Sequence, residues 1–218
     1  FHTSDTIMRI ENLPERLVIL GGGFIAVEMA HVFDALGTQV TIVARRKRLL
    51  RGADESIRDR ITSMYAERLD LRTSATVKQV NHDNTFDLHM DDGTVLQADQ
   101  LLVATGRQPN SDRLEVARGG IAVDDNGYVT TDEYLRTSTE GVWALGDITN
   151  PAQLKHTANE EARVVAHNLL HPGSPRPIDR SLVPYAVFGH PQIASVGATE
   201  EELTAQGTPH LVSARDYA

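Results

Sequence analysis

Cysteine is the residue that this sequence lacks altogether, since none occurs among its 218 positions. The chain can therefore form no disulfide framework and no thiolate metal site of its own. The absence fits a protein of a reducing compartment, and we expect a cytoplasmic location. Any thiol chemistry connected with the chain would have to come from residues outside it.

Long apolar runs and an excess of positive charge are missing as well. No apolar run approaches the ~18 residues that a membrane-spanning helix needs, and no signal-peptide pattern opens the chain. The formal net charge of -9 argues against a nucleic acid or an anionic membrane as the main partner. Because the chain begins with Phe1 and not with Met, we interpret it as a segment of a longer polypeptide.

The first half of the chain alternates short apolar runs with stretches of helical periodicity. We expect strands at 16–20, 39–43 and 101–104, and helices at 24–36 and 54–69. Alternating strands and helices are typical of a parallel sheet that carries helices on its faces. The sequence therefore predicts an α/β fold with a Rossmann-like domain.

The second expected helix leads into a different pattern. Asp54 is its expected N-cap. Its expected apolar face consists of Ile57, Ile61, Met64 and Leu69. Three short apolar segments follow at 77–80, 86–90 and 95–96, and Asp92-Gly93 between the last two favours a hairpin. These segments predict a small antiparallel meander within the α/β domain.

After residue 106 the pattern becomes less regular. The expected elements are strands at 121–123, 128–129 and 142–145 and a helix at 158–170. Prolines at 172, 175 and 177 indicate a stiff linker. A strand-rich segment is expected from Val183 onward.

A glycine cluster directly follows the first expected strand and precedes the first expected helix. Gly21-x-Gly23-x-x-Ala26 matches the dinucleotide-binding fingerprint, with Ala at the third position. Gly21 permits a tight turn, Gly23 lets a pyrophosphate approach the backbone, and Ala26 keeps helix and strand close. The helix N-terminus offers free N–H groups to the phosphates. A glycine turn that binds nothing is the alternative.

The end of the second expected strand indicates which dinucleotide is bound. An NAD site usually places Asp or Glu there to accept the ribose 2′-hydroxyl. Residues 43–51 contain no carboxylate, and five of these nine residues are basic. Guanidinium groups match a 2′-phosphate well. The loop therefore favours NADPH, and a solvated basic loop without a ligand is the alternative.

Three further motifs make the chain recognisable. Residues 104–110 read Ala-Thr-Gly-Arg-Gln-Pro-Asn, residues 137–147 end in Trp-Ala-Leu-Gly-Asp, and residues 183–197 contain Phe-Gly-His-Pro. Together with the glycine cluster, these motifs resemble those of the flavin-dependent pyridine nucleotide-disulfide oxidoreductases. The resemblance runs from about Thr3 to the end of the chain.

The resemblance implies a domain organisation. Residues 1–105 are similar to the NADPH-binding domain of the family, 106–177 to a central segment that completes the FAD site, and 182–218 to the truncated start of an α+β dimer-interface domain. The implied architecture is a flavoprotein with two dinucleotide-binding domains, which forms a homodimer as the full-length protein.

The resemblance also implies site residues, with FAD and NADPH as cofactors. For NADPH the implied residues are Gly21, Gly23, Phe24, Ile25, Ala26, Glu28, Arg45, Arg51, Gly106 and Val187. For FAD the implied residues are Gly146, Asp147, Leu154, Lys155 and His156. Glu28 would support the reaction by holding the nicotinamide end. Each assignment has an ordinary structural alternative: Phe24 can be helix–sheet packing, Glu28 a surface helix carboxylate, and Asp147 only the cap of a turn.

By the same resemblance, the reaction passes hydride from NADPH through FAD to an active-site disulfide. That disulfide then reduces a low-molecular-weight disulfide, and the resemblance favours mycothiol disulfide over glutathione disulfide. The cysteine pair and the catalytic His–Glu pair of the family are absent from 1–218, so we expect no catalytic residue and no turnover in this segment alone. No metal is expected, because His167 and His171 share a helix face without a third ligand.

Two other functions stay open at this point. The parent protein can be an NADPH oxidase or transhydrogenase flavoprotein that lacks a redox disulfide. The chain can also be a nucleotide-binding module only, although an unfinished interface domain would leave an unpaired sheet edge.

Overall fold

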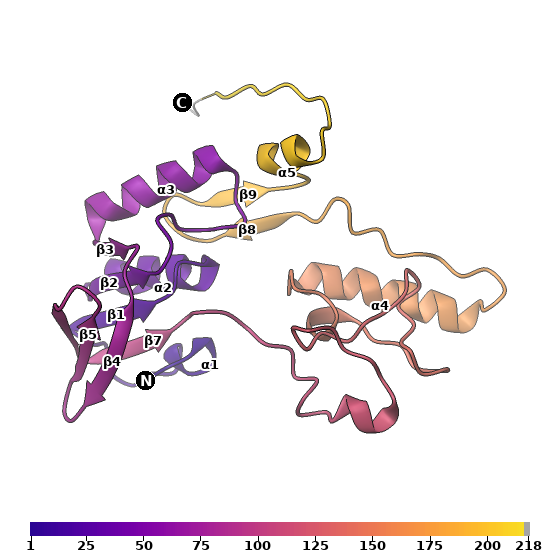
Figure 1. The fold of residues 1–218 in the computed structure, drawn as a ribbon, viewed down its shortest axis with the longest axis horizontal. Helices are drawn as coiled ribbons and strands as arrows, with labels where there is room; N and C mark the ends of the chain where they lie inside the picture. The colour runs from indigo at the N-terminus through magenta and orange to yellow at the C-terminus, as the bar shows by residue number, and fades with distance from the viewer. Residues whose placement is uncertain (216–218) are drawn as a thin grey trace. The chain divides into compact units, whose positions relative to one another are not determined.

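The computed structural model describes residues 1–215 and shows an α/β fold (Figure 1). Contacts separate the chain into two units, one made of residues 1–106 with the segment from 186 onward, the other of residues 107–185. In the first unit the helices and strands are α1 (Ser4–Ile7), β1 (Arg16–Leu20), α2 (Phe24–Ala35), β2 (Gln39–Ala44), α3 (Glu55–Arg68), β3 (Asp70–Thr73), β4 (Val77–His82), β5 (Phe86–Met90), β6 (Val95–Ala98), β7 (Gln100–Val103), β9 (Ile193–Ser195) and α5 (Glu200–Ala205). The second unit contains the 3₁₀ turns η1 (Val116–Gly119) and η2 (Gly146–Ile148) and the helix α4 (Lys155–Leu170). The strand β8 (Tyr185–Val187) lies where the chain returns to the first unit.

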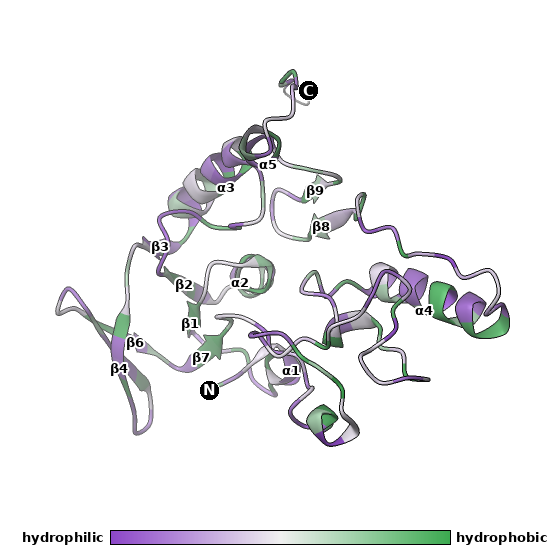
Figure 2. Ribbon diagram, turned by 45° about the vertical axis from the view of Figure 1, so that its right-hand side comes forward, coloured by the Kyte–Doolittle hydropathy of each residue, from purple (hydrophilic) through white to green (hydrophobic). Residues whose placement is uncertain are grey.

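A four-stranded parallel sheet with the order β3-β2-β1-β7 forms the centre of the first unit. In the middle of the sheet, Ile19 lies opposite Ile42 on one side and Leu102 on the other, and all three are fully buried. A parallel sheet that is covered on both faces favours continuous apolar strands. Figure 2 shows β1 and β7 in green accordingly. The predicted α/β fold with a parallel sheet is confirmed.

The predicted antiparallel meander is confirmed too. The strands β4, β5 and β6 pair in sequence order, with Gly93 at a φ of 87° in the turn between β5 and β6. The inner face of the meander packs on the parallel sheet. This cluster consists of Val18, Val43, Phe86, Leu88, Met90, Ala98 and Leu101. Because successive residues of a strand point to opposite faces, Val18 faces the meander and its neighbours on β1 face the other side.

The predicted apolar face of α3 is partly wrong. Ile61 is buried, but Ile57 and Met64 are exposed, and the second buried residue is Tyr65. The helix therefore packs through Ile61 and Tyr65, which are four residues apart. The Tyr65 hydroxyl donates a hydrogen bond to the Val27 carbonyl of α2 at 3.0 Å. Asp54 stands at the N-cap position, yet its carboxylate accepts a hydrogen bond from Glu200 N and makes no bond to its own helix.

Of the α-helices and strands, three were not predicted: α1, β3 and α5. The short helix α1 precedes the first expected strand. The edge strand β3 is polar, with the sequence Asp-Leu-Arg-Thr, and among the described strands it pairs with β2 alone. The helix α5 lies in the segment that we expected to be strand-rich. Its N-terminus carries a capping box, in which the Thr199 hydroxyl accepts from Glu202 N and the Glu202 carboxylate accepts from Thr199 N. The last three residues of the predicted interface domain, 216–218, lie outside the described residues.

The second unit has little regular structure besides α4. The predicted strand at 142–145 is wrong, because Trp143 forms only an isolated bridge with Arg136. The segments near 121–123 and 128–129 likewise meet only at the bridge between Val123 and Val129. Helix α4 begins at Lys155, three residues earlier than expected. Its core cluster contains Leu135, Val164 and Val165, with Trp143, Leu145 and Ile178 partly buried against it.

In the described part of the chain, no helix combines the length and the apolar character that crossing a bilayer would demand.

Candidate cofactor sites

Gly21, the first glycine of the fingerprint, lies where the carboxyl ends of β1, β2 and β7 meet. Gly21 follows β1 with a φ of 135°, a region that side chains rarely adopt. Its N–H donates to the Val43 carbonyl of β2 at 2.9 Å. A Cβ atom on Gly21 would lie only 2.2 Å from the carbonyl oxygen of Ala104, directly after β7. Only glycine can therefore bring the three strand ends together here.

The second glycine leaves the space in front of α2 open. Gly23 is the N-cap of α2. Among residues 1–215, no side chain caps this helix, and a Cβ at Gly23 would meet no atom within 4 Å. Ala26, one turn later, is fully buried against the sheet. The uncapped N–H groups and the positive end of the helix dipole can accept an anionic ligand.

The basic loop lies directly beside the glycine turn. Leu50 N donates to the Gly22 carbonyl at 2.7 Å, and Leu50 itself has a φ of 53°. Leu49 is fully buried, and its side chain lies close to Gly22. Arg45 and Arg51 are exposed, and neither engages in an ion pair within residues 1–215. The two buried leucines thus hold the loop in place while its cations point to solvent.

One arginine of the loop differs from the others. The Arg48 guanidinium donates to Glu55 at 2.7 Å and to Asp59 at 3.0 Å, both on α3. The hydrogen bond to Glu55 raises the pKa of Arg48 above its ordinary value. Its charge is therefore balanced by two carboxylates, and Arg48 anchors the loop to α3.

At the far end of the first turn of α2, Glu28 has a structural partner. Its Oε1 accepts a hydrogen bond from Phe188 N at 2.9 Å, just after the buried Val187 of β8. Phe24 is 42% exposed, and Ile25 is partly buried. Gly106 has a φ of 148° and no atom within 4 Å of its potential Cβ. These residues, apart from Gly106, lie along α2 and the segment that packs on it.

Sequence reasoning missed the residues that hold this segment against α2 and α3. A Cβ on Gly189 would lie 2.7 Å from the Tyr65 hydroxyl and 2.9 Å from Val27. The rings of His31 and His190 stack at 5.8 Å. Burial raises the pKa of Tyr65 above its ordinary value. The Gly-His-Pro motif at 189–191 is visible in the sequence. The residues that it contacts lie more than a hundred positions earlier in the chain, so the sequence did not reveal the contact.

In the second unit, the Gly-Asp motif forms the turn η2. Gly146 has a φ of 76°, and a Cβ there would contact Ala158 of α4 at 3.4 Å. The Asp147 carboxylate is about half exposed and accepts a hydrogen bond from Arg107 at 3.4 Å. Arg107 belongs to the motif at 104–110, and its pairing with Asp147 was not predicted.

The start of α4 contains the other residues predicted to bind FAD. Leu154 is the N-cap residue and makes no side-chain cap. Lys155 Nζ donates to Asn159, and His156 Nε2 donates to the Pro184 carbonyl at 2.7 Å. Both side chains are engaged within the unit, so the backbone N–H groups of this helix start are the groups available to a ligand.

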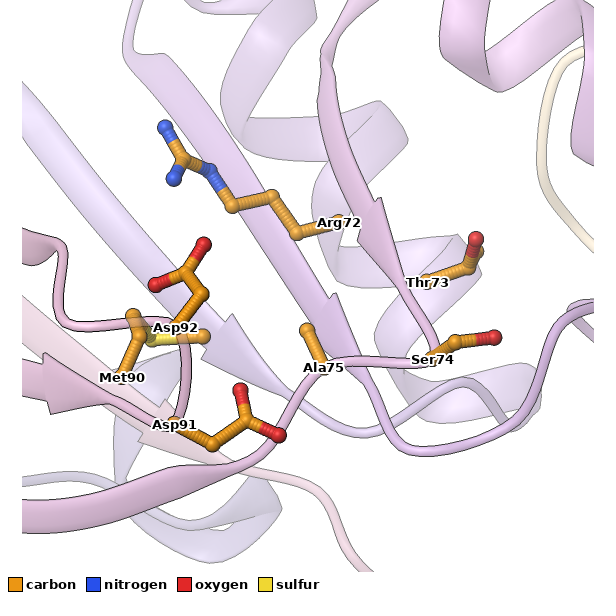
Figure 3. Close-up of a pocket in the computed structure, with 7 residues that line it drawn as sticks. All are labelled: Arg72, Thr73, Ser74, Ala75, Met90, Asp91 and Asp92. Carbon is orange, nitrogen blue, oxygen red and sulfur yellow. The ribbon is translucent and has the colours of Figure 1, made fainter.

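A shallow hollow of about 460 Å³ lies elsewhere in the first unit. It is lined by Arg72, Thr73, Ser74, Ala75, Met90, Asp91 and Asp92. Figure 3 shows the Arg72 guanidinium and the Asp92 carboxylate on the same side of the hollow. Hydrogen bonds from Thr94 hold the pKa of Asp92 below its usual range. None of the candidate cofactor residues lines this hollow.

The histidine pair of α4 stacks without a third ligand. The rings of His167 and His171 lie 4.5 Å apart, and each ring donates to a backbone carbonyl. Residues 1–215 contain no group of three or more His, Cys, Asp or Glu side chains arranged to hold a metal ion.

Comparison with known proteins gives three kinds of similarity. The family model described as pyridine nucleotide-disulphide oxidoreductase matches residues 1–162. A mycothione reductase of Mycobacterium tuberculosis is 49% identical over 222 residues, covering 100% of this chain and 48% of the relative. A glutathione reductase of Burkholderia cepacia is 35% identical, covering 92% of this chain and 45% of the relative.

Solved structures agree with these relatives. The HOCl-induced flavoprotein disulfide reductase RclA of Escherichia coli superposes with a TM-score of 0.85 at 33% identity, covering 94% of this chain and 48% of that one. LpdA of Mycobacterium tuberculosis gives a TM-score of 0.82 at 28% identity, covering 94% and 45%. The chain spans about half the length of the relatives it matches. It belongs, by its sequence and its fold alike, to the pyridine nucleotide-disulphide oxidoreductase family.

Proposed function

We propose that this chain is the NADPH-binding and FAD-completing part of a flavoprotein disulfide reductase. The observation that carries the proposal is the hydrogen bond from Leu50 N to Gly22 O, at 2.7 Å. This hydrogen bond holds the basic loop beside the uncapped N-terminus of α2. The N–H groups of the helix N-terminus can bind a pyrophosphate, and the arginines of the loop can bind a 2′-phosphate.

The charges of the loop support NADPH in preference to NADH. Arg48 is balanced by Glu55 and Asp59, while Arg45 and Arg51 are exposed. Two exposed guanidinium groups next to the phosphate-binding turn favour a ligand with an extra phosphate. In an NADH site, a carboxylate would be expected where this loop has arginine.

Other residues of the first unit would orient the dinucleotide. Gly21 and Gly23 allow the close approach, Ile25 and Ala26 pack the helix beneath it, and Gly106 leaves room at the end of β7. Glu28, Phe24 and Val187 would contact the nicotinamide end, with the second oxygen of Glu28 available for its carboxamide. When bound, NADPH supplies a hydride and FAD accepts it.

The second unit would complete the FAD site. Asp147 would hold the ribityl or pyrophosphate end, next to Gly146. The free N–H groups at the start of α4, around Leu154, Lys155 and His156, would stabilise negative charge on the reduced ring. The redox cysteine pair would come from outside this chain, which contains no cysteine.

Among disulfide substrates, the relatives favour mycothiol disulfide. The identity of 49% to a mycothione reductase exceeds the 35% to a glutathione reductase. We further propose that the full-length protein is a homodimer, that it acts in the cytoplasm, and that its domain boundaries follow 1–105, 106–177 and 182–218.

The deciding experiment measures NADPH oxidation by the full-length protein. Mycothiol disulfide and glutathione disulfide are assayed side by side, with NADH as the alternative reductant. Turnover of mycothiol disulfide alone would support the proposal in full. Preference for glutathione disulfide would reassign the substrate. Reduction of oxygen without turnover of either disulfide would replace the reductase by an oxidase, and absence of any reaction with NADPH would overturn the proposal.

A further inference from the structure

A fully buried carboxylate lies in the second unit, outside the glycine fingerprint, the basic loop and the Gly-Asp motif. Glu161 of α4 has no exposed surface, although it is charged. Burying a carboxylate is costly unless hydrogen bonds and an opposite charge compensate for the lost water. Its surroundings show how this compensation is achieved.

Each oxygen of Glu161 has its own partners. Oε2 accepts a hydrogen bond from Gly146 N at 2.5 Å. Oε1 accepts from Arg180 Nε at 3.0 Å and Nη2 at 2.7 Å, and from Asn150 Nδ2 at 3.4 Å. The carboxylate therefore links α4 to both ends of the Gly-Asp turn, through Gly146 and Asn150, and to the segment after α4, through Arg180.

The turn held by Glu161 is otherwise closed by its own backbone. Thr149 N and Asn150 N both donate to the Gly146 carbonyl, at 2.9 and 3.1 Å. Gly146 lies against Ala158, one turn before Glu161 on the helix. The Gly146 N–H points away from the turn and toward α4, and Glu161 receives it. The orientation of the turn on the helix therefore depends on this carboxylate.

We propose that Glu161 is a positioning residue for FAD. By holding the Gly146 N–H, it fixes the direction in which the next side chain, the half-exposed Asp147, leaves the turn. Arg180 balances the charge of Glu161 from the other side, while the half-exposed Asp147 is paired separately with Arg107. This inference rests on the proposed function, because it assigns FAD to Asp147.

Replacement by glutamine is the sharpest change, because all four contacts of Glu161 come from donors. A glutamine side chain offers only one acceptor oxygen, and its NH₂ group would face Gly146 N–H or the Arg180 guanidinium without an acceptor. The matched control is Glu160→Gln, since Glu160 is the neighbouring residue, is exposed, and pairs with Arg163 at 2.7 Å.

The experiment uses the full-length flavoprotein, stripped of FAD and reconstituted. We expect Glu161→Gln to raise the Kd for FAD about 10- to 100-fold, as the loss of a buried charged hydrogen bond does. The visible circular dichroism of the bound flavin should change as well, a signal that a general loss of stability would not move. Glu160→Gln should keep the Kd for FAD within about twofold, and the Kd for NADPH should be unchanged in both variants.

A second variant keeps the test decisive if Glu161→Gln does not fold. Arg180→Lys retains the positive charge beside Glu161 but loses the planar two-point contact, and it should raise the Kd for FAD about 3- to 10-fold. Wild-type FAD affinity and flavin dichroism in any folded variant of Glu161 or Arg180 would overturn the positioning role alone. If the unaltered protein itself bound no FAD, the proposed function would fall first.

Discussion

At the scale of single residues, neighbours in the basic loop have different roles. Arg48 is tied to α3 by Glu55 and Asp59, whereas Arg45 and Arg51 face solvent. The sequence showed five basic residues in a row of nine, but it could not separate the anchor from the candidate ligands. That distinction needs the position of α3, which depends on the packing of its own buried residues and not on the loop itself.

We expect the double change Arg45→Ala and Arg51→Ala to weaken NADPH binding about 30- to 1000-fold, because under the proposed function each guanidinium would make a charged hydrogen bond to the 2′-phosphate. Binding of NADH should change little. Fluorescence titration with both nucleotides measures the two Kd values. Arg118→Ala, which removes an 80% exposed arginine of the second unit, is the control for lost charge. Equal losses for NADPH and NADH would remove the assignment of the loop to the 2′-phosphate.

At the scale of elements, an ion pair between Arg16 and Asp99 ties the start of β1 to the turn between β6 and β7. Asp99, between β6 and β7, accepts from Arg16 N at 2.8 Å and from Arg16 Nη2 at 2.7 Å at the start of β1. These contacts, led by the side-chain hydrogen bond, hold the pKa of Asp99 below its usual range. A lowered folded-state pKa stabilises the fold above the unfolded-state pKa of about 3.9, and this stabilisation is lost as the pH falls through the folded-state value.

Asp99→Asn should therefore lower the urea midpoint at pH 7, and the difference from the unaltered chain should shrink as the pH falls from about 5 toward 3. Urea unfolding followed by circular dichroism across this range measures both midpoints. Asp125→Asn, at an exposed turn position of the second unit, controls for the loss of one negative charge. A difference that grows in acid would contradict the assigned direction.

The elements also show what could be predicted from sequence. The strands β1, β2 and β7 were predicted because a parallel sheet buried on both faces demands apolar runs. The edge strand β3 was missed because an edge position tolerates polar residues. The apolar run at 142–145 resembles a strand, but Trp143 and Leu145 pack into the cluster around Leu135, and the run pairs through no more than the isolated bridge between Trp143 and Arg136. The glycine fingerprint was visible in sequence, whereas Glu161 was not, because its partners are 11 to 19 residues away.

At the scale of the whole molecule, the two units should respond separately to a nucleotide. A ligand that binds only the folded state stabilises it by about 2.7 kcal/mol at one hundred times its Kd. We expect NADPH to slow amide hydrogen exchange in residues 1–106 and 186–205 and to leave 107–184 largely unchanged. Exchange followed by mass spectrometry with and without NADPH measures this, with NADH at the same concentration as the comparison. Slower amide exchange confined to 107–184 would contradict the prediction, because the nucleotide would then bind the second unit.

The first unit is interrupted in sequence, and this has a consequence for the order in which the protein is made. Residues 1–106 leave the ribosome before the segment that packs on α2 and α3, and the whole of 107–185 is synthesised in between. At about 5–20 residues per second, this interval lasts on the order of 4–16 s. During that time the surface around Val27 and Tyr65 lacks the segment around Gly189 that packs on it. A nascent chain of this protein can therefore complete its first unit only after Gly189 and its neighbours have emerged from the ribosome.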